Sequence, residues 1–281
     1  MPLDHSLAPM RDYHKAKRLL WDPRDIDLTA DRADWATLTD TERDSLLRLC
    51  SLFLAGEEAV TCDLAPLLLA LRADGRLEDQ MFVTTQLFEE AKHVEFFDRW
   101  LSEVVVTPVD LAPYRGEAYR TLFDVELPTA LDRLLTDPSA HAQVIAVATY
   151  HMSVEGVLAE TGYYIVGQAM GARGVTPGLV QGMQLIQRDE ARHIAFGISL
   201  LERLIGREPA LMDALTERMD TLLPITLDII GDAFAPYGDA IPFGLVPAQL
   251  IEYAAGQFSH RMNAVARRAA GIRHTEMESA P

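Results

Sequence analysis

Apolar residues recur along this chain at the three-to-four-residue spacing of amphipathic helices, and no stretch alternates in the way a half-buried strand does. Long helices are expected over about 39–73, 77–105, 138–171 and 176–204, followed by helices over about 208–233 and 246–271. Short connections between helices of this length are typical of bundles. The pattern therefore predicts an all-α protein built as a helical bundle.

Local signals place the ends of several of these helices. A capping box, Thr39–x–x–Glu42, opens the first long helix, and Pro66 is expected to kink it near its end. Asp137–Pro138 and Thr176–Pro177 each have the form of an N-cap residue followed by proline at the first helical position. The third and fourth long helices are therefore expected to begin at these two dipeptides.

The remaining segments carry weaker patterns. Residues 1–40 are mixed and are expected to form a loop-like N-terminal extension, and 114–135 is expected to hold shorter helices interrupted by Pro128. The last residues, 274–281, are expected to be a flexible tail. With 49% hydrophobic residues, the 281-residue chain is expected to form one domain over 1–281.

Charge and cysteine content narrow the function and the compartment. A formal charge of −17 argues against a surface for nucleic acid or for anionic membranes. The start of the chain lacks the apolar core of a signal peptide, and no apolar run is long enough to span a bilayer. Cys50 and Cys62 would lie roughly 18 Å apart on one helix, too far for a disulfide, so both are expected to be core thiols. We therefore expect a soluble, cytoplasmic protein.

Two similar stretches carry the candidate chemistry. EEAKHVEFF at 89–97 and DEARHIAFG at 189–197 each place a Glu three residues before a His, namely Glu90 with His93 and Glu190 with His193. Residues at i and i+3 lie on one helix face, so each pair can reach a single metal ion. One such pair could instead belong to a solvated, ion-paired face. Two pairs on apolar helical stripes indicate metal sites, because a buried carboxylate needs a partner.

Two further helices offer the additional carboxylates that a dinuclear carboxylate bundle requires. On the first long helix, Glu57 shares helical spacing with apolar residues whereas Glu58 does not, so Glu57 is the inward candidate. On the third long helix, periodicity does not separate Glu155 from Glu160. Four carboxylates and two imidazoles suit two iron or manganese ions better than zinc.

With these motifs in place, the chain resembles the ribonucleotide-reductase small-subunit superfamily. The resemblance rests on LLWDPRDIDLTADRADWATLTDTER near the N-terminus, on VEG at 154–156 and on TPGLVQGMQLIQRDEARHIAF at 176–196. It covers roughly residues 20–200. Within the superfamily the chain is most similar to the ligand-binding oxidases, which hold a manganese–iron pair and a long-chain fatty acid.

The resemblance implies a complete set of metal ligands, and its intervals select Glu155 over Glu160. The first metal, manganese, would be held by Glu57, Glu90 and His93, and the second, iron, by Glu155, Glu190 and His193. Glu90 would bridge the two ions, and an Fe/Fe pair is an alternative to Mn/Fe. The resemblance also implies that Asp189 orients the first ligand histidine and that Trp21 belongs to the same network.

In this oxidase family a valine becomes joined to a tyrosine by an ether bond, and the matching residues here are Val60 and Tyr150. Val60 lies one helical turn from Glu57 on the same face. Tyr150 precedes Glu155 by five residues, about 140° away around a regular helix. A local π-bulge, a feature common at functional sites, would bring Tyr150 toward the metals.

Departures from the reductase subunits define the alternatives. Subunits that store a tyrosyl radical place a Tyr four residues after the first ligand His, where this chain has Phe97, and the tail RRAAGIRHTEMESAP lacks an aromatic residue. The resemblance implies an oxidase that activates dioxygen, forms the ether cross-link and oxidises a hydrophobic substrate, as a homodimer. A radical-supplying reductase subunit, a diiron oxygenase or desaturase, and a metal-storage protein are the competing hypotheses.

Overall fold

A computed structural model describes the backbone of residues 2–279 and the side chains of residues 2–267. The α-helices are α1 (Ala8–Arg18), α2 (Thr29–Thr37), α3 (Asp40–Asp63), α4 (Ala65–Ala73), α5 (Leu77–Trp100), α6 (Glu117–Arg120), α7 (Leu127–Asp132), α8 (Ala140–Val147), α9 (Glu160–Val166), α10 (Pro177–Arg207), α11 (Leu211–Phe234) and α12 (Pro247–Ser279). The π-helical segments are η2 (Leu101–Val105), η4 (Thr121–Glu126), η6 (Ala148–Ala159) and η7 (Gly167–Gly171). Short 3₁₀ turns are η1 (Pro23–Asp25), η3 (Ala112–Tyr114), η5 (Arg133–Leu135), η8 (Ala235–Tyr237) and η9 (Pro242–Gly244). No strand occurs among these residues, which confirms the all-α prediction.

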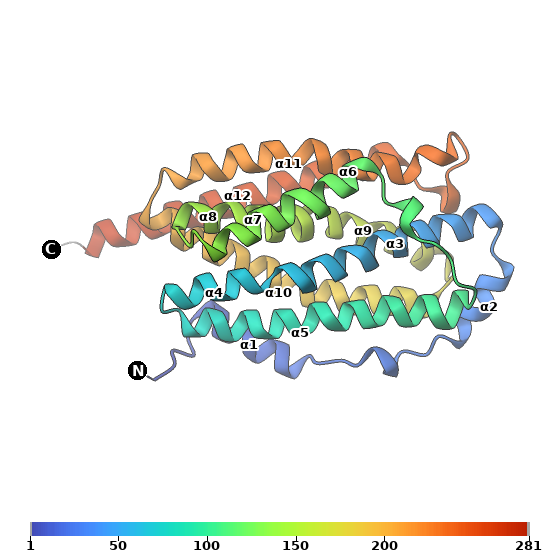
Figure 1. The fold of residues 1–281 in the computed structure, drawn as a ribbon, viewed down its shortest axis with the longest axis horizontal. Coiled ribbons are helices and arrows are strands. Elements are labelled where there is room, and N and C mark those ends of the chain that lie inside the picture. Colours follow the sequence, from blue (N-terminus) through green and yellow to red (C-terminus); the bar gives the residue numbers. More distant parts are fainter. Residues whose placement is uncertain (1, 280–281) are drawn as a thin grey trace.

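Four long helical stretches form the centre of a ferritin-like bundle. They are α3, α5, α10 and the continuous run α8–η6–α9, and in Figure 1 they lie along the long axis of the molecule. α3 packs on α5, α10 packs on both α5 and η6, and α11 and α12 cover η6 from the outside. The carboxylate-bearing segments therefore all face one interior.

Close approach of α10 to α5 depends on a glycine. A Cβ atom at Gly182 would lie 2.0 Å from the ring of Phe96 on α5, so no larger residue fits without moving that ring. Nearby, Phe82 of α5 and Phe196 of α10 stack with their ring centroids 4.8 Å apart. This packing fixes the distance between the two helices that carry the Glu-x-x-His motifs.

The predicted start of the first long helix is confirmed. Near Pro66 the helix does not merely kink but ends, and a separate helix follows. Thr39 and Glu42 form a complete capping box at the start of α3. The helix ends at Asp63, and α4 begins at Ala65 with Pro66 at its second position. Proline is tolerated there because the first helical N–H groups have no intrahelical acceptor.

The loop-like prediction for residues 1–40 is wrong, because this segment contains α1 and α2. α1 buries Met10 and Ala16 and contacts α5. In α2, the buried carboxylate of Asp31 accepts hydrogen bonds from the backbone N–H groups of Gly178 and Leu179, at 2.7 and 2.8 Å, and so caps α10. Short, charge-rich helices of this kind are stabilised by contacts with distant parts of the chain, which a local pattern does not reveal.

Two other boundary predictions need correction, and a third is confirmed. The third long helix begins at Ala140, with Ser139 rather than Asp137 as its cap. The predicted start of α10, with Thr176 as N-cap residue and Pro177 first in the helix, is confirmed, although Asp31 and not the Thr176 side chain supplies the capping acceptor. Pro128 does not interrupt its helix, because the π-helical segment η4 precedes it and widens the backbone there.

Cys50 is buried as predicted, whereas Cys62 is exposed, so the prediction of two core thiols is half wrong. None of the described helices is long and apolar enough to cross a membrane. The flexible tail expected at 274–281 cannot be compared, because its side chains lie outside the described residues. The backbone of 280–281 lies outside them as well. That tail and the single-domain assignment stay predictions.

Candidate metal centre

All six predicted ligands come together in the middle of the bundle. They are Glu57 from α3, Glu90 and His93 from α5, Glu155 from η6, and Glu190 and His193 from α10. All six are buried, and they form two groups of four in which the candidate ligand atoms lie within 4.8 Å of one another. The exposed neighbour Glu58 and the more distant Glu160 belong to neither group.

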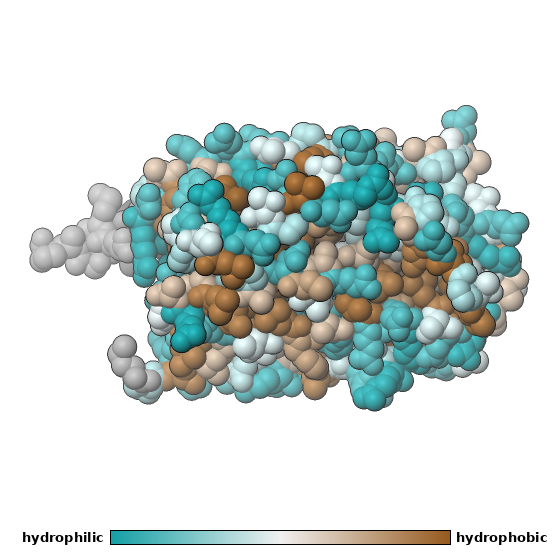
Figure 2. Space-filling view, in the orientation of Figure 1, coloured by the Kyte–Doolittle hydropathy of each residue, from teal (hydrophilic) through white to brown (hydrophobic). Residues whose placement is uncertain are grey.

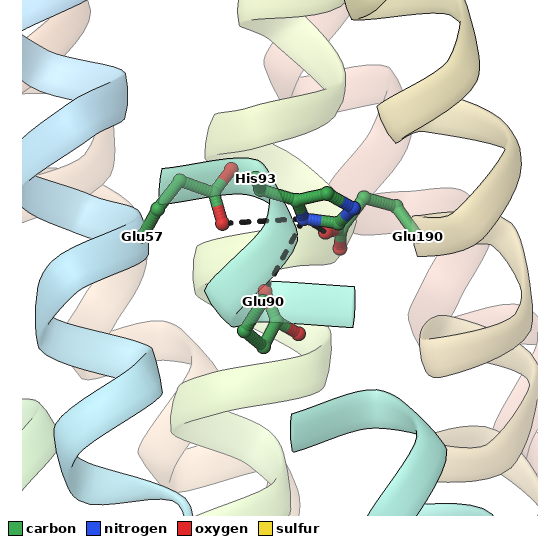
Figure 3. Close-up of side chains that lie close together, drawn as sticks. All are labelled: Glu57, Glu90, His93 and Glu190. Atoms are coloured by element: carbon green, nitrogen blue, oxygen red, sulfur yellow. Dashed lines mark ion pairs between the residues drawn. The ribbon is translucent and has the colours of Figure 1, made fainter. Parts of the chain in front are cut away.

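The first group joins three helices, as Figure 3 shows, with Glu57 and Glu190 reaching toward His93 from opposite sides. The Nδ1 atom of His93 lies 3.4 Å from Glu57 Oε2, 3.4 Å from Glu190 Oε1 and 3.5 Å from Glu90 Oε2. One imidazole nitrogen therefore faces oxygen atoms of three carboxylates.

The second group repeats this arrangement around His193. Its Nδ1 atom lies 3.0 Å from Glu90 Oε1, 3.3 Å from Glu155 Oε1 and 3.5 Å from Glu190 Oε2. Glu90 and Glu190 thus belong to both groups, each with one oxygen toward each histidine. The family resemblance implied this shared position for Glu90 alone.

The donor set fits a pair of metal ions. The Nδ1 atoms of both histidines and the Oε2 atoms of Glu155 and Glu190 are buried without a hydrogen-bond partner. Among the described residues, the ion pairs of the four carboxylates are all with the two histidines, and none is with Lys or Arg. Four buried carboxylates without a cationic side chain need added positive charge, which two divalent ions would supply.

The shifted pKa values in the centre also indicate that the buried carboxylates need added positive charge. Burial raises the pKa of Glu57 to about 8 and the pKa of Glu155 well above its usual value. Burial alone would lower the pKa of His93 and of His193, but the surrounding carboxylates outweigh it and raise both. Without metal ions, protons neutralise part of this cluster.

Outer carboxylates hold the other nitrogen of each histidine. His93 Nε2 lies 3.4 Å from Oδ2 of Asp189, the residue that the family resemblance implied for this contact. Trp21 Nε1 and Lys92 Nζ donate to the same oxygen, at 2.7 and 2.6 Å. Such a partner fixes the orientation of a metal-binding imidazole and its proton.

The matching partner of His193 was missed from the sequence. His193 Nε2 lies 2.9 Å from Glu89 Oε2. Arg192 forms ion pairs with Glu89 and with Asp189. The repeated pattern contained the signal, because Glu89 stands before Glu90 as Asp189 stands before Glu190.

Tyr150 and Glu155 share the π-helical segment η6. Backbone bonds in a π-helix join residues five apart, so these two side chains project from the same side. The Tyr150 hydroxyl donates to Glu90 Oε1 at 2.6 Å, and Arg261 Nε donates to the carbonyl of Gly156 within the same segment. The local π structure that the sequence analysis invoked for Tyr150 is therefore present.

An apolar cavity extends from the carboxylates. Val60, Tyr150 and all four carboxylates line one end of it. The rest of its wall is mainly apolar and includes Leu49, Phe53, Phe123, Ile229 and Phe234. The space between its walls, including the part that meets solvent, is about 750 Å³.

Phe97 occupies the position at which radical-storing relatives have a tyrosine. It is fully buried and stacks on Phe53, with ring centroids 5.3 Å apart. No hydroxyl group is available there to form a tyrosyl radical.

Comparison with known proteins agrees with this geometry. Residues 10–241 match the family model for the ribonucleotide reductase small chain. Among solved structures, R2-like ligand-binding oxidase with aerobically reconstituted Mn/Fe cofactor is 37% identical, with a TM-score of 0.90, over 93% of this chain and 94% of that one. The same oxidase with its metal cofactor after photoconversion is 36% identical, with a TM-score of 0.89 and the same coverage. The chain therefore belongs to the ribonucleotide reductase small-chain family and, within it, to the R2-like ligand-binding oxidases.

Proposed function

We propose that this protein is an oxygen-activating dinuclear oxidase with one manganese and one iron ion. Its first metal would be held by Glu57, Glu90 and His93, and its second by Glu155, Glu190 and His193, with Glu90 and Glu190 placed to serve both. Support comes from the unpartnered ligand atoms and from the Mn/Fe cofactor of the related oxidases. The same donor set also suits an Fe/Fe pair.

The observation that carries the proposal is the position of Tyr150. Its hydroxyl donates to the shared carboxylate Glu90, and its ring lines the apolar cavity together with Val60. A reduced metal pair, when bound, would deliver electrons to dioxygen and so supply the oxidising power for C–H cleavage. The hydrogen bond to the buried carboxylate of Glu90 fixes the direction of the phenolic O–H, while the apolar wall limits water at the site.

We propose that this oxidation joins Tyr150 Oη to the β-carbon of Val60. Forming the C–O bond breaks one O–H and one C–H bond, and it releases two protons and two electrons. Dioxygen accepts these two electrons and two more from the reduced metals, and with four protons it becomes two molecules of water. The cross-link would form once per chain, as a maturation step.

The cavity suggests the ligand class. Its only ionisable carboxylates lie at the metal end, and its lining contains no Lys or Arg. A long-chain fatty acid would place its carboxylate toward the metals and its chain along the apolar wall, and a similar hydrophobic molecule would be the substrate. A homodimer and a cytoplasmic location complete the proposal.

The proposal is tested by peptide mass spectrometry on metal-free protein reconstituted with Mn(II) and Fe(II), with and without oxygen. We expect an oxygen-dependent peptide that joins the Val60 and Tyr150 segments and is lighter than the separate peptides by two hydrogens. Tyr150→Phe, which keeps the ring and removes the hydroxyl, is the control and should give no joined peptide.

Absence of the joined peptide, with both metals bound and oxygen consumed, would reject the cross-link. Binding of a large catalytic subunit would then favour a radical-supplying reductase subunit. Activity with iron alone would favour a diiron oxygenase.

A further inference from the structure

Gln86 contacts the centre without being a candidate ligand or part of the cavity wall. It is fully buried on α5, one turn before Glu90. Its Nε2 atom lies 3.0 Å from Tyr150 Oη and 3.2 Å from Glu155 Oε1. Nε2 of His151, which is also fully buried, lies 3.3 Å from Gln86 Nε2 and 3.4 Å from Gln86 Oε1.

The bonding partners fix the orientation of the Gln86 amide. Burial lowers the pKa of His151 to about 3, so its ring is neutral and carries one proton. Nδ1 of His151 has no partner, and a buried N–H without an acceptor is costlier than an unpaired acceptor, so the proton belongs on Nε2. His151 then donates to Gln86 Oε1, which leaves both amide hydrogens for Tyr150 and Glu155. When Glu155 is ionised, as a metal ligand must be, the reversed amide would set two oxygens against each other there.

Packing holds His151 at this position. A Cβ atom at residue 197 would lie 2.4 Å from the Cβ of His151, so Gly197 on α10 leaves the room that the histidine fills. The His151 ring also packs against Tyr150, with ring centroids 4.5 Å apart. His151 is therefore a fixed support for the Gln86 amide.

We infer that Gln86 is a positioning residue that directs the phenolic proton of Tyr150 toward Glu90. Because the Gln86 N–H occupies a lone pair of the phenolic oxygen, the O–H is left to point at Glu90 Oε1. The second N–H holds Glu155 Oε1 in place. That this proton matters for cross-link formation rests on the proposed function. The hydrogen-bond geometry itself is independent of that function.

The experiment compares Gln86→Leu, Gln86→Met and Gln143→Leu with the unmodified protein. Leucine removes both donors, and methionine also removes them while keeping the length of the side chain. Gln143 is the matched control, since it is also buried but bonds to Asp74 and to the carbonyl of Pro138, away from the centre. Metal content, cross-link yield and the ultraviolet resonance Raman doublet of Tyr150 are measured. The Tyr150 doublet is isolated by subtracting the spectrum of a Tyr150→Phe counterpart.

We expect both Gln86 variants to bind two metals but to show an altered Tyr150 doublet in metal-free protein. Their rate of cross-link formation should fall by about tenfold, the effect of losing one buried hydrogen bond. Gln143→Leu should match the unmodified protein in all three measurements.

The inference is overturned if either Gln86 variant keeps the unmodified doublet, or if Gln86→Met forms the cross-link at the unmodified rate. A loss of metals equal to that of a ligand variant would also overturn it. If the unmodified protein forms no cross-link, the proposed function fails, while the Raman comparison still decides the role of Gln86.

Discussion

The two Glu-x-x-His motifs supply equivalent inner ligands but have different surroundings. Around His93, the outer carboxylate Asp189 is contacted by Trp21, Lys92 and Arg192. Around His193, the outer carboxylate Glu89 pairs with Arg192. The same local spacing therefore produces two unequal halves of one centre.

Neighbouring elements cause this inequality. Trp21 comes from the N-terminal segment, and its ring lies parallel to His93 with centroids 6.3 Å apart. The half around His193 instead faces η6, where Glu155 receives a hydrogen bond from Gln86. A motif can thus fix the type of ligand, while residues from other helices distinguish the two sites, as a centre holding two different metals requires.

The largest effect is expected where the halves are joined. Glu190→Ala should weaken the binding of both metals by more than about 100-fold, because Glu190 belongs to both ligand groups. Removing a residue that only supports a ligand usually weakens metal binding by about 10–100-fold. Metal content after dialysis, measured by mass spectrometry, tests this. Glu58→Ala, on an exposed carboxylate beside Glu57, should retain both metals. Full retention of one metal by Glu190→Ala would show that this carboxylate serves only one site.

The next comparison separates the halves. His93→Ala should lose mainly manganese and His193→Ala mainly iron, because each removes the only imidazole from one group. Each variant should therefore retain one of the two metals after reconstitution with an equal mixture of Mn(II) and Fe(II). Retention of the same metal by both variants would contradict the assignment of metals to the two sites.

Outer carboxylates should give a smaller and unequal effect. Asp189→Ala and Glu89→Ala should each lower metal affinity by about 10–100-fold. Asp189→Ala should also lower the unfolding free energy of the metal-free protein by about 3–5 kcal/mol, because it leaves Lys92 buried without its carboxylate. Glu89→Ala should cost less, since Arg192 keeps Asp189. Metal titration and urea unfolding measure both effects, and equal losses would argue against the asymmetry.

The smallest effect, counted per pH unit, concerns protons in the metal-free centre. The pKa of Glu57 is about 8 in the folded protein against an ordinary 4.5, so between these pH values the folded state binds more protons than the unfolded state. Stability should therefore fall as pH rises from about 4.5 to about 8, by at most about 1.4 kcal/mol per pH unit for this one group. The raised pKa values of His93 and His193 act in the same direction.

Urea unfolding of metal-free protein at several pH values checks this trend. Glu57→Gln should reduce the slope, because the amide does not titrate. An unchanged slope in Glu57→Gln would show that Glu57 does not hold a proton in the folded state.

Much of the centre was predictable because it depends on local spacing. Helical periodicity chose Glu57 over Glu58, and the first is buried while the second is exposed. Periodicity could not separate Glu155 from Glu160, because η6 is π-helical and the regular α-helical angles do not apply there. The resemblance made that choice, and Glu155 lies in the cluster.

Residues within a few turns of one another are enough to specify the long helices, the apolar stripes and the two Glu-x-x-His pairs, whereas the short helices α1 and α2 were not predicted. Tertiary structure decided the pairing of Glu89 with His193, the sharing of Glu190 and the capping of α10 by Asp31. Each of these contacts joins residues about 100 or more positions apart, so it depends on how whole helices pack. Local periodicity contains no information about that packing.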